Sequence, residues 1–265
     1  VPSKRFAMTR FLARMTHPAP SSRRVAIIND GRSYVGPALA RMLADRGHDL
    51  AIGDPADGLV EELRSSGAVV VPVEGVAGLR DEGQARRLVD AATDRFGRID
   101  AAVVFSGRII GGRFVRSSLD DLHSLVRGCL EAPYHFLKAV VPVMTEQHDG
   151  QILVITSAAG ARPVPGAALY SSVRAAATML ARNVAAEVAR SGVQVNAVGT
   201  NFMDFPEFVR ATGADTPDGL ARVVADVPLG RLGTLEEFAS FCVPFVDGSS
   251  RFTTGQFVGY AGGWV

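Results

Sequence analysis

The stretch Arg24 to Gly47, R-V-A-I-I-N-D-G-R-S-Y-V-G-P-A-L-A-R-M-L-A-D-R-G, decides the fold because it reads as a strand, a turn and a helix in succession. Its first part, Val25–Asn29, is a short apolar run that is typical of a buried strand. Its last part, Gly36–Arg46, has apolar residues at helical spacing. We therefore predict the first strand and helix of an α/β domain here.

The same alternation continues to the end of the chain. Six further apolar runs predict strands at Asp49–Gly53, Ala68–Val73, Ala101–Phe105, Gln151–Ser157, Val193–Val198 and Gln256–Tyr260. The segments between them predict helices near Gly58–Ser66, Gln84–Phe96, Leu119–Glu146, Ala167–Arg190 and Leu235–Val246. Strands that alternate with helices form a parallel sheet covered on both faces, so we predict a doubly wound, seven-stranded sheet. Ligands of such sheets bind beyond the carboxyl ends of the strands.

Composition limits the class of protein. A chain of 265 residues suits one such domain, which we place at residues 24–265. The net charge of +1 gives no strong field for nucleic acid, and no apolar run is long enough for a membrane span. The only cysteines, Cys129 and Cys242, lie in apolar patterns, which favours a reducing, cytoplasmic location. The five histidines lack ligand spacing, so no metal is expected.

Residues 1–23 differ in character from the rest of the chain. They contain several Lys and Arg residues, three prolines and no acidic residue. A transit peptide would have a similar composition. We expect a tail ahead of the fold, either flexible or added to the natural protein.

Three residues predict a proton-transfer site. Tyr170 and Arg174 are four residues apart in a predicted helix and therefore share one face. A free tyrosine is protonated at neutral pH, but a permanently charged arginine beside it favours the phenolate, which can act as a base. Ser157 ends a predicted strand, where its hydroxyl could hold a substrate oxygen.

Over nearly all of Arg24 to Gly263 the chain resembles the short-chain dehydrogenase/reductase superfamily. The motifs that carry this resemblance are I-T-S-A-A-G at Ile155–Gly160, Y-S-S-V-R at Tyr170–Arg174, V-Q-V-N-A-V at Val193–Val198, P-L-G-R-L-G at Pro228–Gly233 and T-G-Q-F-V-G-Y-A-G-G at Thr254–Gly263. The resemblance implies a Rossmann-like fold, which agrees with the sheet predicted from periodicity.

The chain departs from that superfamily at the residues that contact its dinucleotide. The glycine loop T-G-x-x-x-G-x-G is N-D-G-R-S-Y-V-G here, with Asp30 and Tyr34 at two of the three glycine positions. A carboxylate repels phosphate and a phenol ring fills the space of the pyrophosphate, so we expect no cofactor. Asp54 is the observation against this view, because NAD-preferring enzymes place a ribose-binding acid there. The superfamily's catalytic asparagine aligns with Cys129, and its lysine is Arg174.

Within this superfamily, the chain resembles the halohydrin dehalogenases, which carry an aromatic residue in the former glycine loop. That resemblance implies conversion of vicinal haloalcohols to epoxides with release of halide and a proton, and ring opening of epoxides by azide, cyanide or nitrite. Ser157, Tyr170 and Arg174 would be catalytic. The halide would bind at Tyr34, Thr200, Asn201, Phe202 and Met203, and the substrate pocket would contain Phe105, Ala159, Val164, Phe205 and Phe208. Ser106 stands where some members have an aspartate.

On this hypothesis the protein is a cofactor-independent carbon-halide lyase. Its partners are a small haloalcohol or epoxide and a small anion, and analogy with the superfamily predicts a homotetramer. Two alternatives stay open. One is an NAD(P)-dependent short-chain oxidoreductase with a degenerate glycine loop, and the other is a non-catalytic binding protein on the same fold.

Overall fold

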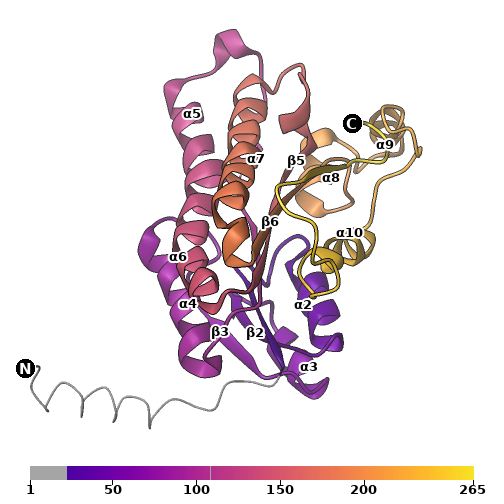
Figure 1. Cartoon of the computed structure of the whole chain (residues 1–265). Coiled ribbons are helices and arrows are strands. Elements are labelled where there is room, and N and C mark those ends of the chain that lie inside the picture. The colour runs from indigo at the N-terminus through magenta and orange to yellow at the C-terminus, as the bar shows by residue number, and fades with distance from the viewer. Residues whose placement is uncertain (1–22, 108) are drawn as a thin grey trace, which may run out of the picture.

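Seven parallel strands form a single sheet in the computed structural model of this chain, which describes residues 23–107 and 109–265 (Figure 1). The strands are β1 (Arg24–Ile28), β2 (His48–Gly53), β3 (Val70–Val73), β4 (Ala101–Phe105), β5 (Gly150–Ser157), β6 (Val193–Thr200) and β7 (Phe257–Tyr260). Their spatial order is β3-β2-β1-β4-β5-β6-β7. The order reverses between β1 and β4, as in doubly wound sheets, so the predicted fold class is confirmed.

Helices cover both faces of the sheet (Figure 1). One face carries α4 (Glu82–Phe96), α6 (Ala132–Gln147) and α7 (Ala168–Val188), whose apolar residues share a core with the sheet. The other face carries α2 (Gly36–Asp45), α3 (Leu59–Ser65) and α10 (Leu235–Cys242). Because both faces are packed, strand β5 is buried along its whole length.

The long helix predicted at Leu119–Glu146 contains a change of helix type. Helix α5 (Leu119–Val126) passes into a π-helical turn, Arg127–Glu131, before α6 begins. A π-helical turn inside an α-helix inserts an extra residue and is often found at functional sites. The apolar periodicity of the sequence does not reveal it, because each flanking segment keeps ordinary helical spacing.

Two short helices between β6 and α10 were not predicted. They are α8 (Pro206–Thr212) and α9 (Pro217–Val224), and each begins with a proline at its first position. Seven or eight residues are too few to show an apolar period. The two helices form a small lobe beside the carboxyl ends of β5 and β6 (Figure 1).

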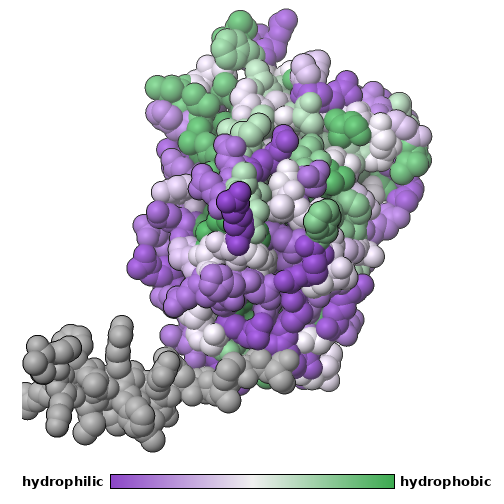
Figure 2. Space-filling view, in the orientation of Figure 1, coloured by the Kyte–Doolittle hydropathy of each residue, from purple (hydrophilic) through white to green (hydrophobic). Residues whose placement is uncertain are grey.

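Several expectations concern the outside of the molecule. Of the predicted tail, residues 1–22 lie outside the described residues. No helix in the described ranges is long and apolar enough to cross a membrane. Figure 2 shows apolar side chains gathered at the end of the molecule where α5 begins, and Phe114, Val115 and Leu119 are the exposed residues there.

Candidate active site

Ser157 lies at the carboxyl edge of the sheet, where the topology predicted it. It ends β5, and its register partner on β6 is Thr200. The Ser157 side chain is buried, and its Oγ donates to the main-chain oxygen of Thr200 at 3.3 Å and accepts from the Ala159 N–H at 3.2 Å. The hydroxyl is thus held between two loops that follow neighbouring strands.

Tyr170 and Arg174 lie on one face of α7, as the spacing predicted. Both residues are only 8% exposed. The guanidinium carbon of Arg174 lies 5.2 Å from the centre of the Tyr170 ring, which is within range of a cation–π interaction. Burial alone would lower the pKa of Arg174, but its attraction to Tyr170 and Cys129 outweighs this and raises that pKa. Arg174 therefore keeps a permanent positive charge beside Tyr170.

Tyr34 extends from the loop after β1 into the space in front of β6. Its hydroxyl donates to Oγ1 of Thr200 at 2.8 Å, and its ring packs against Phe105, Phe205 and Phe238 at centroid distances of 6.0, 4.7 and 5.9 Å. Burial raises the pKa of Tyr34 above its ordinary value of 10, although the hydrogen bond to Thr200 opposes this shift. Tyr34 is therefore a neutral, packed side chain rather than a base.

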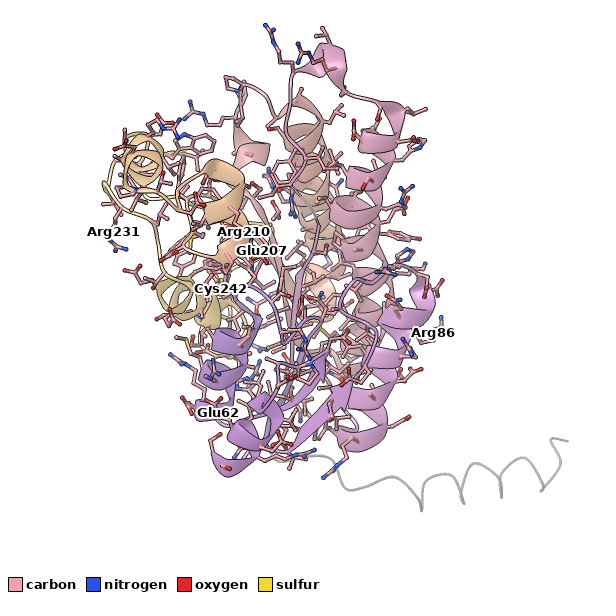
Figure 3. All side chains as sticks on the ribbon, turned by 180° about the vertical axis from the view of Figure 1, so that it is seen from behind. Glu62, Arg86, Glu207, Arg210, Arg231 and Cys242 are labelled. Atoms are coloured by element: carbon pink, nitrogen blue, oxygen red, sulfur yellow. The ribbon has the colours of Figure 1, made fainter. Side chains whose placement is uncertain are left out.

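Two main-chain N–H groups of the loop after β6 donate hydrogen bonds to acceptors within the chain. The N–H of Phe202 donates to Oδ1 of Asn201 at 3.0 Å, and the N–H of Asn201 donates to the oxygen of Tyr260 at 3.3 Å. Both N–H groups therefore have acceptors within the chain, and the halide-binding role expected for Asn201 and Phe202 stays a prediction. Asn201, Phe202 and Met203 line a cavity of about 110 Å³ together with Tyr260. Arg231 also lines it and forms an ion pair with Glu237, and its side chain points outward at the edge of the molecule (Figure 3).

The residues predicted to line one substrate pocket divide between two clusters. Ala159 and Val164 pack in the same apolar cluster as Tyr170. Phe105 and Phe205 pack around Tyr34 instead, and Phe208 contacts Phe205. Only the first group lies in the cluster of the expected base, and a shared substrate pocket for all five residues stays a prediction.

The loop between β1 and α2 does not fit a dinucleotide as it is folded. Oδ1 of Asp30 accepts the N–H groups of Arg32 and Ser33 at 2.9 and 3.0 Å, so a carboxylate occupies donors that would face a phosphate. The Tyr34 ring fills the space alongside. A phosphate bound at these two N–H groups would therefore have to displace the Asp30 carboxylate.

Asp54 is also engaged within the chain. Its carboxylate accepts N–H groups of Gly75, Val76 and Ala77 at 2.6, 2.8 and 2.6 Å. Burial alone would raise the pKa of Asp54, but these donors outweigh it and lower that pKa. The Asp54 carboxylate therefore anchors the loop after β3.

Comparisons with known proteins place the chain in a family. The profile described as "Enoyl-(Acyl carrier protein) reductase" matches residues 32–265, so the chain belongs to the short-chain dehydrogenase/reductase family. A 3-oxoacyl-[acyl-carrier-protein] reductase from Thermotoga maritima is 28% identical and aligns over 91% of this chain and 98% of its own length. Other curated relatives are likewise reductases and dehydrogenases.

Solved structures of this fold include both oxidoreductases and a dehalogenating protein. Levodione reductase superposes with a TM-score of 0.82 at 24% identity, over 91% of this chain and 96% of that one, which supports the fold alone. A structure titled "Dehalogenation enzyme" superposes with a TM-score of 0.80 at 25% identity, over 92% and 98%.

These comparisons correct the expected class of enzyme. The family profile and the curated relatives are reductases and dehydrogenases, so the classification as a carbon-halide lyase of the halohydrin dehalogenase type is wrong. The coarser expectation, an enzyme of the short-chain dehydrogenase/reductase family, is the one that they support. Of the two predicted activities, NAD(P)-dependent oxidoreduction is the better supported.

Sequence reasoning missed three groups around Arg174. They are the main-chain oxygen of Ser106, the glycine at 107 and the thiol of Cys129. Ser106 was singled out only as a position where some relatives have an aspartate, and Cys129 only as a residue in an apolar pattern that aligns with the superfamily's catalytic asparagine. No sequence signal identifies an acceptor on the main chain, because every residue has one.

Proposed function

We propose that this chain is an oxidoreductase that interconverts an alcohol and a carbonyl group, with Tyr170 exchanging a proton with the reacting oxygen. The observation that carries the proposal is the match to a 3-oxoacyl reductase over more than nine-tenths of both chains, with a buried serine at the end of β5 and a buried tyrosine on α7. Buried hydroxyl groups from β5 and α7 are suited to bind one oxygen atom.

Tyr170, Ser157 and Arg174 would have different roles in the reaction at that oxygen. In reduction, Tyr170 would donate the proton that converts the developing alkoxide into an alcohol, and in oxidation its phenolate would remove that proton. Ser157 would donate a hydrogen bond to the same oxygen in place of the one it now gives to Thr200. Arg174 would stabilise the phenolate that remains after proton donation. Transfer of the hydride has no residue assigned to it in this chain.

A direct assay tests this function. NADH or NADPH consumption would be followed with a panel of small ketones and β-ketoesters, and the reverse reaction with the corresponding alcohols. We expect nucleotide-dependent turnover that falls by about 100-fold or more in Tyr170→Phe, which keeps the ring but cannot exchange a proton. If the folded wild-type protein neither consumes nucleotide with any of these compounds nor gains thermal stability in its presence, the oxidoreductase function is excluded.

A second candidate is favoured by the closed nucleotide cleft. The Tyr34 hydroxyl at 2.8 Å from Thr200 and the engaged Asp30 carboxylate favour chemistry without hydride transfer, such as an isomerisation in which Tyr170 removes a proton from the substrate. Such a reaction would need no nucleotide, so protein from which all nucleotide has been removed would still catalyse it. Monitoring substrate consumption by nuclear magnetic resonance, with and without nucleotide, separates the two candidates.

A further inference from the structure

We propose that the turn formed by Ser106 and Gly107, directly after β4, positions the guanidinium of Arg174 against Tyr170. The proposal rests on the role of Tyr170 in proton exchange proposed above. Arg174 is 8% exposed, and none of the ion pairs in the described ranges joins it to a carboxylate. A buried cation without an acidic partner depends on neutral groups for its position.

Hydrogen bonds connect this turn to Arg174 on α7 and to Gly128 in the π-helical turn. Nη2 of Arg174 donates to the main-chain oxygen of Ser106 at 2.8 Å. Oγ of Ser106 donates to the oxygen of Gly128 at 2.7 Å, within the π-helical turn Arg127–Glu131. Helices often rearrange their main-chain bonds at such a turn. Ser106 thus connects the irregular part of one helix to the charged side chain of another.

Steric contacts fix the turn at Gly107. This residue has φ of +106°, a conformation that favours glycine. A Cβ atom there would lie 2.4 Å from Sγ of Cys129 and 3.0 Å from Nη2 of Arg174. Only a hydrogen at this position lets the thiol and the guanidinium pack against the turn.

Few other groups hold the guanidinium. The ionisable groups that act on it are Tyr170 from its own helix, Cys129 from the π-helical turn and Tyr34 from the loop after β1. Its Nε has no hydrogen-bond partner among the described residues. Displacing Nη2 would therefore move the positive charge away from the Tyr170 ring, and the phenolate would lose its stabilising cation.

Gly107→Ala tests the proposal, and Gly112→Ala is the matched control. Gly112 lies in the same loop and also has positive φ, +150°, but a Cβ there would meet no atom within 4 Å. The measurement is the pH at which Tyr170 phenolate absorbance appears. It is obtained by subtracting the same variant carrying Tyr170→Phe, because the chain has four tyrosines. We expect this midpoint to rise by about one pH unit or more in Gly107→Ala and to stay unchanged in Gly112→Ala.

Two further variants make the test decisive. Cys129→Ala in the Gly107→Ala background removes the 2.4 Å contact and should restore part of the midpoint. Ser106→Ala keeps the main-chain acceptor but frees the turn from Gly128, so a smaller rise is expected. A folded Gly107→Ala protein with the wild-type midpoint would overturn the proposal. If that variant does not fold, an unchanged midpoint in Ser106→Ala overturns it instead.

The absorbance measurement uses no substrate, so it separates this proposal from the proposed function. A shifted midpoint without oxidoreductase turnover would leave the positioning role in place and exclude the function. Turnover with an unshifted midpoint would support the proposed function and overturn the positioning role.

Discussion

Replacing Tyr34 with glycine should open the cleft between the loop after β1 and the end of β6. Removing a packed aromatic side chain costs about 3–5 kcal/mol of folding free energy. Glycine recovers about 1 kcal/mol, because Tyr34 has φ of +49° and glycine adopts this conformation without strain. We therefore expect Tyr34→Gly to lower the free energy of unfolding by about 2–4 kcal/mol.

The same free energy opposes nucleotide binding in the wild type. A dinucleotide must displace the Tyr34 ring from Phe105, Phe205 and Phe238 and break its hydrogen bond to Thr200. At about 1.4 kcal/mol for each tenfold change, this makes wild-type affinity about 30- to 1,000-fold weaker than that of Tyr34→Gly. Tyr34→Phe keeps the ring, so its affinity should stay close to wild type and its stability within about 1 kcal/mol.

Urea unfolding and titration calorimetry with NADPH measure these two quantities on the same three proteins. Wild-type protein that binds NADPH as tightly as Tyr34→Gly would refute the reasoning, because Tyr34 would then impose no cost. A loss of stability equal in Tyr34→Phe and Tyr34→Gly would also contradict it, since the ring rather than the hydroxyl is assigned most of the free energy.

Three further predictions concern single side chains. Ser157→Ala should lower turnover by about 100-fold while changing stability by only about 1 kcal/mol, measured by steady-state kinetics and urea unfolding. Burial, assisted by Arg24, lowers the pKa of His48 below the value of an unfolded chain, so stability should be lost as pH falls below about 6.5; denaturation from pH 7 to 5 should show a smaller loss in His48→Gln. Asp54→Asn should cost about 1–3 kcal/mol at pH 7, and because the folded-state pKa of Asp54 is lowered, this difference from wild type should shrink as pH falls below about 4.

Much of the fold follows from local patterns in the sequence. The buried strand Ala101–Phe105 has the predicted bounds, and the other strands differ by a few residues at their ends. Burial on both faces demands continuous apolar runs, and such runs are visible without a structure. The π-helical turn at Arg127–Glu131 and the helix Pro206–Thr212 were missed because neither leaves a distinct period.

The class of enzyme was the larger error. Asp30, Tyr34 and Arg174 differ from the residues of a typical reductase, and these differences were given more weight than the similarity of the whole chain. The comparisons show that this similarity extends over residues 32–265 and is with reductases. The differences describe the local chemistry of the cleft, whereas the overall similarity identifies the family.

The sequence by itself determined that Tyr170 and Arg174 share a helix face and that a carboxylate and a phenol stand in the former glycine loop. Helical spacing and residue identity are local properties, so one chain suffices to read them. Only the tertiary structure decided what these groups contact. The Tyr34 hydroxyl meets Thr200, 166 positions away, and Arg174 meets the oxygen of Ser106, 68 positions away. Such bonds depend on how strand ends and helices are brought together in space, and no spacing in the sequence encodes that arrangement.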